Sequence, residues 1–211
     1  LAKKYNILLI IDNCFATPYL QKPISFGADL VIHSATKLMD GQGRVLGGVT
    51  VGKKELIKEL FLFTRNSGAS LSPFNAWVLS KSLETLSLRV DRHSNNALKI
   101  AHQLEKQRNV NRVKYPFLKS HPQYNLAKKQ MLKGGNIISF EVEGGLKAAR
   151  AFINSIKMCS ISANLGDSRT IITHPASSTH SKLSLEDRFK IGITDNMIRL
   201  SVGLEHHEDI W

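Results

Sequence analysis

Two hydroxyl side chains and a lysine stand close together in the segment of residues 31–48. Ser34 and Thr36 are two residues apart, and Lys37 follows directly. Hydroxyl groups can donate hydrogen bonds to one anion, and a lysine amine that is kept out of water or near other cations becomes a nucleophile toward carbonyl carbon. The segment therefore predicts anion binding next to a reactive amine.

This pattern has three interpretations. The simplest is a strand, a turn and an exposed lysine. The second is the S-x-x-K motif of serine acylases, with Ser34 as nucleophile and Lys37 as its base. Those enzymes carry S-D-N and then K-T-G further along, whereas here the nearest segments, residues 133–135 and 194–196, are imperfect and in the reverse order. The acylase interpretation is therefore weak.

The third interpretation is a lysine that holds pyridoxal phosphate, with the two hydroxyls on its phosphate. It predicts an acidic residue at the carboxyl end of a neighbouring strand, where it would pair with the pyridinium nitrogen. The apolar run of residues 7–11 is typical of a strand buried on both faces, and it ends in Asp12. Ligands of open α/β sheets bind beyond the carboxyl ends of strands, and both Asp12 and the lysine segment fall there.

Several further segments carry a resemblance to a known family. They are residues 11–18 (Ile-Asp-Asn-Cys-Phe-Ala-Thr-Pro), 33–37 (His-Ser-Ala-Thr-Lys), 71–74 (Leu-Ser-Pro-Phe), 164–167 (Asn-Leu-Gly-Asp), 173–177 (Thr-His-Pro-Ala-Ser) and 199–205 (Arg-Leu-Ser-Val-Gly-Leu-Glu). In this order they resemble the Cys/Met-metabolism family of pyridoxal phosphate enzymes over essentially the whole chain.

The resemblance implies an α/β fold in two parts. Residues 1–92 would form the C-terminal half of the large cofactor-binding domain, of the aspartate-aminotransferase-like fold type I, and residues 93–211 a smaller α/β domain. Family members are nearly twice as long, and this chain starts at Leu1 without a methionine. We therefore expect a C-terminal fragment that is inactive by itself.

The resemblance also assigns roles near the amino terminus. Lys37 becomes the lysine that forms the Schiff base with pyridoxal 5′-phosphate and then moves protons on the substrate. Asp12 becomes the partner of the pyridinium nitrogen, and Ser34 and Thr36 the ligands of the phosphate. Cys14 stands where relatives often have threonine beside the cofactor ring, and it is either a ring contact or a small buried apolar residue.

Two residues near the carboxyl terminus match the substrate side of the family site. Arg199 corresponds to the arginine that binds the α-carboxylate of the substrate, a planar anion that suits a bidentate guanidinium. Asn164 stands where many relatives have serine near that carboxylate. The amide keeps donor and acceptor ability, and it favours the branch of the family that carries out sulfhydrylation.

The implied reaction is γ-replacement on O-succinylhomoserine by sulfide, which gives homocysteine and succinate in methionine biosynthesis. Cystathionine γ-synthase and methionine γ-lyase activities remain alternatives. The resemblance further implies a homotetramer, a dimer of dimers, in the full-length protein. An interpretation of another class is a non-catalytic, basic interaction module.

Composition weighs against other partners. The formal net charge is +12, yet the basic residues are scattered and form no nucleic-acid-binding motif. No stretch approaches the ~20 apolar residues of a membrane span. Two cysteines provide no disulfide framework, so we expect a cytoplasmic protein. The histidines lack metal-ligand spacing, and we expect no metal.

The middle of the chain carries strong helix signals. Ser72 followed by proline predicts a helix over residues 73–92, with Trp77 facing inward and Arg89 outward. A separate helix is expected over residues 95–107.

Other elements follow from periodicity and capping signals. Ser184 and Asp187 resemble a capping pair that starts a helix ending near residue 190. Further helices are expected over residues 53–63, 123–131 and 146–156, and strands over residues 7–11, 28–32, 45–51, 112–114, 136–142, 161–164, 170–172 and 197–202.

Overall fold

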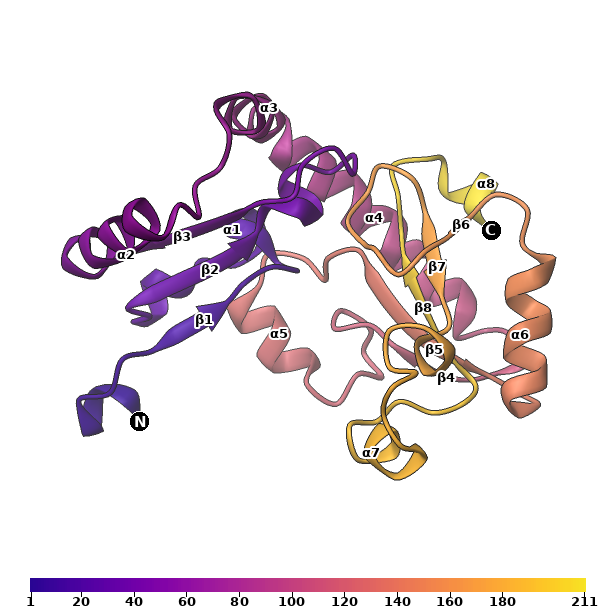
Figure 1. Ribbon diagram of the computed structural model, residues 1–211. Helices are drawn as coiled ribbons and strands as arrows, with labels where there is room; N and C mark the ends of the chain where they lie inside the picture. Colours follow the sequence, from indigo (N-terminus) through magenta and orange to yellow (C-terminus); the bar gives the residue numbers. More distant parts are fainter. The chain divides into compact units, whose positions relative to one another are not determined.

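The computed structural model describes residues 1–211, which divide into two compact units, Leu1–Ser87 and Leu88–Trp211 (Figure 1). No helix of the chain is both long enough and apolar enough to cross a membrane.

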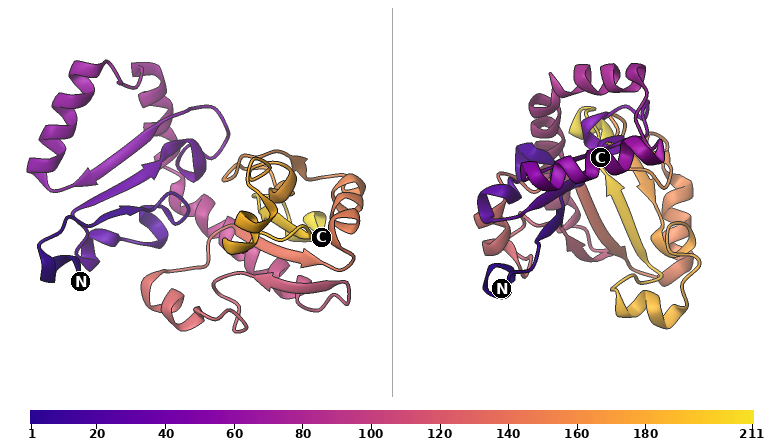
Figure 2. Two further views of the ribbon diagram at one scale, coloured as in Figure 1. Left: turned by 60° about the horizontal axis from the view of Figure 1, so that its bottom comes forward. Right: turned by 60° about the vertical axis from the view of Figure 1, so that its left-hand side comes forward.

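The first unit contains a three-stranded mixed sheet. Strand β1 (Ile10–Asp12) runs parallel to β2 (Leu30–Ser34), and β2 runs antiparallel to β3 (Gly48–Gly52). Helix α2 (Lys54–Ser67) follows β3 and lies beside it (Figure 2). The short helix α1 (Thr17–Leu20) connects β1 to β2, and α3 (Pro73–Leu83) comes after α2.

The second unit is built on a five-stranded sheet with the order β4-β5-β8-β7-β6. All neighbours are antiparallel except β6 and β7. The strands are β4 (Val110–Lys114), β5 (Ile137–Val142), β6 (Ser160–Ile161), β7 (Ile171–Thr173) and β8 (Met197–Ser201). The helices that accompany them are α5 (Tyr124–Gln130), α6 (Gly145–Ser155), α7 (Leu185–Lys190) and α8 (His207–Ile210), together with α4 (Leu86–Leu104), which starts in the first unit.

The core of the second unit forms where α4 and α6 cover the sheet. Ile100 and Leu104 of α4, Ile153 of α6 and Phe140 and Leu200 of the strands all belong to one buried cluster. Alternating exposure along β5 turns Ile138, Phe140 and Val142 into this core, as the period of two of a strand requires.

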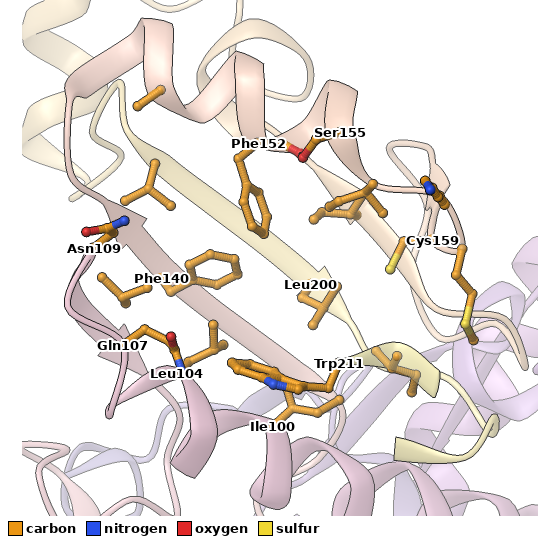
Figure 3. A pocket seen from close by; sticks show the side chains of 18 of the residues that line it. Ile100, Leu104, Gln107, Asn109, Phe140, Phe152, Ser155, Cys159, Leu200 and Trp211 are labelled. Atoms are coloured by element: carbon orange, nitrogen blue, oxygen red, sulfur yellow. The ribbon is translucent and has the colours of Figure 1, made fainter. Parts of the chain in front are cut away.

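A hollow of about 660 Å³ lies over this face of the sheet, between α6 and α4 (Figure 3). Phe140 and Leu200 form its floor, and Phe152, Leu104 and Trp211 stand around it. None of the residues predicted for the active site lines this hollow, so the hollow is distinct from the predicted site.

The helix predictions for residues 73–107 are partly wrong. Ser72 caps α3 as predicted, because its Oγ accepts a hydrogen bond from the Asn75 N–H at 3.2 Å. The helix ends at Leu83, however, and α4 then continues without a break from Leu86 to Leu104. Trp77, predicted to face inward, is 58% exposed, whereas Arg89, predicted to face outward, is buried.

The predicted break near residue 93 is absent because distant backbone groups satisfy the polar side chains there. His93 Nδ1 bonds the Val202 carbonyl at 2.7 Å, and Asn96 Nδ2 donates to the Gly203 carbonyl at 3.1 Å and to that of Glu205 at 2.8 Å. These bonds dock α4 against the segment that follows β8. They place polar residues at the predicted break on the buried face of one continuous helix.

His93 makes the stability of the chain depend on pH. Burial lowers its pKa from 6.5 to about 4, so the folded protein keeps this ring neutral. The stabilisation is complete above pH 6.5 and is lost as the pH falls from 6.5 toward 4, because only the unfolded chain gains the proton there. The depression corresponds to about 3 kcal/mol.

We therefore expect the free energy of unfolding to fall more steeply between neutral and acid pH in wild type than in His93→Asn, whose amide can still donate to Val202. Denaturant titrations at several pH values measure this difference. Equal slopes in the two proteins would contradict the assignment.

Candidate active site

The ends of β1 and β2 bring two of the predicted site residues together. Asp12 is the last residue of β1 and pairs with Ile32 of the neighbouring parallel strand, which ends two residues later at Ser34. Cys14 connects them: its N–H donates to Asp12 Oδ1 at 3.0 Å, and its Sγ accepts from the Ser34 N–H at 2.8 Å. The predicted ring partner and a predicted phosphate ligand thus lie at one edge of the sheet.

Asp12 is ionised at neutral pH. A hydrogen bond from the Cys14 side chain, followed by the one from the Cys14 backbone, lowers the pKa of its carboxyl group. The carboxylate is also exposed in this chain. It is therefore a charged acceptor at the position where the third interpretation requires one.

Lys37 lies in an irregular turn directly after β2. The turn Ala35–Met39 has the wide i→i+5 hydrogen bond of a π-helix, from the Asp40 N–H to the Ala35 carbonyl at 2.9 Å. Lys37 itself has non-helical angles, φ −88° and ψ −133°. Its neighbours Ala35, Leu38 and Met39 are buried, so packing on both sides fixes the backbone of the lysine.

The segment after the lysine is held by a buried charge. The Asp40 carboxylate accepts from Arg44 twice, from the backbone N–H at 2.6 Å and from Nε at 3.0 Å. Arg44 Nη2 then donates to Ser82 Oγ of α3 at 2.7 Å. Packing of Met39 and Val45 against Val78 and Leu79 on α3 strengthens the same attachment, so α3 supports the lysine turn.

Thr36 is engaged with the backbone at the glycine-rich loop. Its Oγ1 accepts from the Gly47 N–H at 3.1 Å and lies 3.4 Å from the Gly47 carbonyl oxygen. The hydroxyl keeps its proton for donation, either to that distant carbonyl or to a phosphate oxygen. Ser34 Oγ makes no hydrogen bond within the chain.

The second unit places Arg199 and Asn164 together. Arg199 lies on β8 between Ser139 of β5 and Thr173 of β7. Its Nη2 donates to the Ala163 carbonyl at 2.8 Å and to the Asn164 carbonyl at 3.3 Å. Burial lowers the pKa of this guanidinium, which nevertheless stays charged. These two carbonyls orient one side of the guanidinium fork toward the loop and leave its other N–H groups for an anion.

The loop that carries Asn164 is fixed by β8 and the turn after it. Ser201 Oγ accepts from the Gly166 N–H at 2.9 Å and from Asn136 Nδ2 at 3.0 Å. Glu205 accepts from the Thr170 N–H at 2.6 Å and from its hydroxyl at 2.9 Å. Arg199 and the loop that carries Asn164 are therefore held by one network of hydrogen bonds.

Sequence reasoning missed the supporting residues of both groups. The four-residue spacing of Asp40 and Arg44 is an ion-pair signal that could have been noticed. No pattern indicates that Gly47 bonds Thr36 or that the Ala163 carbonyl holds Arg199, since both are backbone contacts.

His174, which directly follows β7, has a structural role. His174 Nδ1 bonds Ser177 Oγ at 2.7 Å, and its Nε2 bonds the Asp195 carbonyl at 2.8 Å. Both ring nitrogens are therefore used within the fold.

Comparison with known proteins decides the family. Residues 1–211, the whole chain, match the family model described as Cys/Met metabolism PLP-dependent enzyme. The chain belongs to this family. Its members depend on pyridoxal 5′-phosphate, which is the cofactor predicted from Lys37 and Asp12.

Among curated relatives of this Cys/Met-metabolism chain, O-succinylhomoserine sulfhydrylase of Pseudomonas aeruginosa is 51% identical over 210 residues, covering 100% of this chain and 52% of the relative. L-methionine gamma-lyase of Fusobacterium nucleatum subsp. polymorphum is 46% identical over 207 residues, covering 97% of this chain and 52% of the relative. The chain thus spans about half the length of the relatives that it matches.

A solved structure confirms the predicted fold class. Cystathionine gamma synthase from Xanthomonas oryzae pv. oryzae, in complex with aminoacrylate and cysteine, aligns with a TM-score of 0.96 and 41% identity over 99% of this chain and 54% of its own. The fold is therefore the α/β fold type I of pyridoxal phosphate enzymes. The roles of individual site residues stay predictions, which we develop below.

Proposed function

We propose that the protein to which this chain belongs carries out γ-replacement on O-succinylhomoserine, with sulfide as acceptor, to give homocysteine and succinate. The observation that carries this proposal is the lysine turn: Lys37 follows a hydroxyl pair directly and stands after the strand that is paired with the strand of Asp12. Two observations support sulfhydrylation as the specific activity: Asn164, and the 51% identity with the O-succinylhomoserine sulfhydrylase of Pseudomonas aeruginosa.

The residues of the first unit fit pyridoxal phosphate. Ser34 Oγ makes no hydrogen bond within the chain, and Thr36 Oγ1 donates only across 3.4 Å to the Gly47 carbonyl, a long bond that one to a phosphate oxygen would replace. The two hydroxyls therefore suit a phosphate as neutral donors. The ionised Asp12 fits a protonated pyridinium nitrogen, because the charges are opposite. When bound, pyridoxal phosphate withdraws electrons from the substrate carbon that loses its proton.

Each side chain then has a defined task. Lys37 holds the cofactor before the substrate binds, and its amine afterwards moves protons at Cα and Cβ of the substrate. Asp12 keeps the ring nitrogen protonated. Arg199 binds and orients the α-carboxylate, and the Asn164 segment limits where that carboxylate can lie.

Full-length activity assays test the specific reaction. With O-succinylhomoserine as donor, we expect faster turnover with sulfide than with cysteine as the incoming thiol. Faster use of cysteine would instead favour cystathionine γ-synthase, the name of a solved relative at 41% identity. Release of methanethiol from methionine would favour the γ-lyase.

The remaining parts of the proposal concern the whole protein. We propose residues 1–92 as the C-terminal half of the cofactor domain, residues 93–211 as the smaller domain, a homotetrameric assembly and a cytoplasmic location. We expect the 211-residue chain alone to bind the cofactor poorly. Equilibrium dialysis of this chain and of the full-length protein would compare their affinities. Tight binding of DNA with a steep salt dependence would instead support a basic interaction module.

A further inference from the structure

Cys14 joins two residues that the proposed function assigns to the cofactor. Asp12 and Ser34 end the neighbouring strands β1 and β2, and Cys14 is hydrogen-bonded to both of them. The sulfur accepts from the Ser34 N–H at 2.8 Å, while the Cys14 N–H donates to Asp12 Oδ1 at 3.0 Å.

The thiol keeps its proton. Burial raises the pKa of Cys14 first, and the hydrogen bond with the Asp12 carboxylate raises it further, whereas Ser34 and Lys37 act in the opposite direction. The Cys14 side chain in turn is the leading cause that lowers the pKa of the Asp12 carboxyl group. Cys14 therefore contacts both strand ends: its sulfur accepts from the Ser34 N–H, and its own N–H donates to Asp12.

We propose that Cys14 is a positioning residue for pyridoxal phosphate, which holds the Ser34 backbone with its sulfur and the Asp12 carboxylate with its N–H. The inference rests on the proposed function, because it requires Asp12 and Ser34 to contact the cofactor. It assigns the thiol no nucleophilic role.

Two substitutions separate this role from simple filling of space. Cys14→Ala removes both the donor and the acceptor. Cys14→Ser keeps both functions in a slightly shorter side chain. A residue that only fills space would lose more from serine than from alanine, because an unpaired hydroxyl is costly to bury. A positioning residue gives the opposite order.

Cofactor affinity in the full-length protein measures the difference. With equilibrium dialysis against pyridoxal phosphate, we expect Cys14→Ala to bind about 5- to 10-fold more weakly, the loss typical of one neutral hydrogen bond within a protein. Cys14→Ser should recover most of that loss. The control is Cys159→Ala in the second unit, which should bind as wild type does.

Alkylation provides a second readout in the unmutated protein. Bound pyridoxal phosphate should slow the modification of Cys14 by iodoacetamide, while Cys159, whose pKa burial raises to about 11, should react equally slowly with and without cofactor. Peptide mass spectrometry follows both cysteines in the same digest.

The results separate the two proposals. Equal affinities of wild type and Cys14→Ala, weaker binding by serine than by alanine, or no protection of Cys14 would overturn the positioning role. If borohydride still links the cofactor to Lys37 in the wild-type protein, the proposed function stands without the positioning role of Cys14. If Lys37 is not labelled, the proposed function fails as well.

Discussion

Replacement of Lys37 by alanine in the full-length protein should abolish both covalent attachment of pyridoxal phosphate and turnover. Borohydride reduction followed by peptide mass spectrometry should find the phosphopyridoxyl group on Lys37 in wild type and on no residue in Lys37→Ala. Activity should fall by roughly 10³-fold or more, since the amine acts both as covalent anchor and as proton carrier. Lys37→Arg should be equally inactive, because a guanidinium does not lose its proton near neutral pH.

The matched control is Lys22→Arg, a change at an exposed lysine of the same unit. This variant should keep labelling at Lys37 and full turnover. The fold around the lysine is held by Ala35, Leu38 and Met39, so the cofactor-free forms of wild type and Lys37→Ala should have nearly the same melting temperature. Random labelling of other lysines, with Lys37 unmodified, would contradict the assignment of the lysine.

Local signals in the sequence predicted their structures well. Ser72 and Ser184 both cap helices as expected, because a cap needs only a hydroxyl and an N–H three residues away. The strand-end position of Asp12 followed from an apolar run that stops at a charge. The run itself is only partly a strand, since β1 starts at Ile10 and Leu9 instead bonds Asp29 through its N–H at 2.8 Å.

Contacts between distant segments were beyond such reasoning. The sequence predicted a break between two helices at residues 93–94, and Asn96 at the start of the second helix. The break is absent because the carbonyls of Val202 and Gly203, more than a hundred residues later, accept hydrogen bonds from His93 and Asn96. Arg89 likewise becomes buried because α4 starts anew at Leu86, which changes the face that each residue occupies. Helical periodicity predicts a face only as far as the helix is continuous.

The same limit applies to the candidate site. Residue types and spacing predicted a role for Lys37, and the family resemblance predicted one for Arg199, but neither indicated the backbone groups around them. The Gly47 N–H donates a hydrogen bond to the Thr36 hydroxyl oxygen, and Arg199 Nη2 donates to the carbonyls of Ala163 and Asn164. Such contacts depend on how the chain passes the site, and any residue type can supply a carbonyl.

Arg199 should show its role as a loss of substrate binding. In the full-length protein we expect Arg199→Lys to raise KM for O-succinylhomoserine by roughly 10- to 100-fold, because an ammonium group replaces a bidentate charged hydrogen bond. Arg199→Leu should raise KM further. Steady-state kinetics over a wide range of substrate concentration measures both, and affinity for pyridoxal phosphate should stay near that of wild type.

The anchoring of Arg199 is the reason why we expect lysine to be a poor substitute. Nη2 is already bonded to Ala163 and Asn164, so the planar group presents its remaining N–H donors in one fixed direction. A lysine has a single nitrogen, which must either satisfy those carbonyls or meet the substrate carboxylate. Arg150→Lys on the exposed surface of α6 provides the control and should leave KM unchanged. If Arg199→Lys lowered kcat with an unchanged KM, the arginine would act after binding and the carboxylate assignment would be wrong.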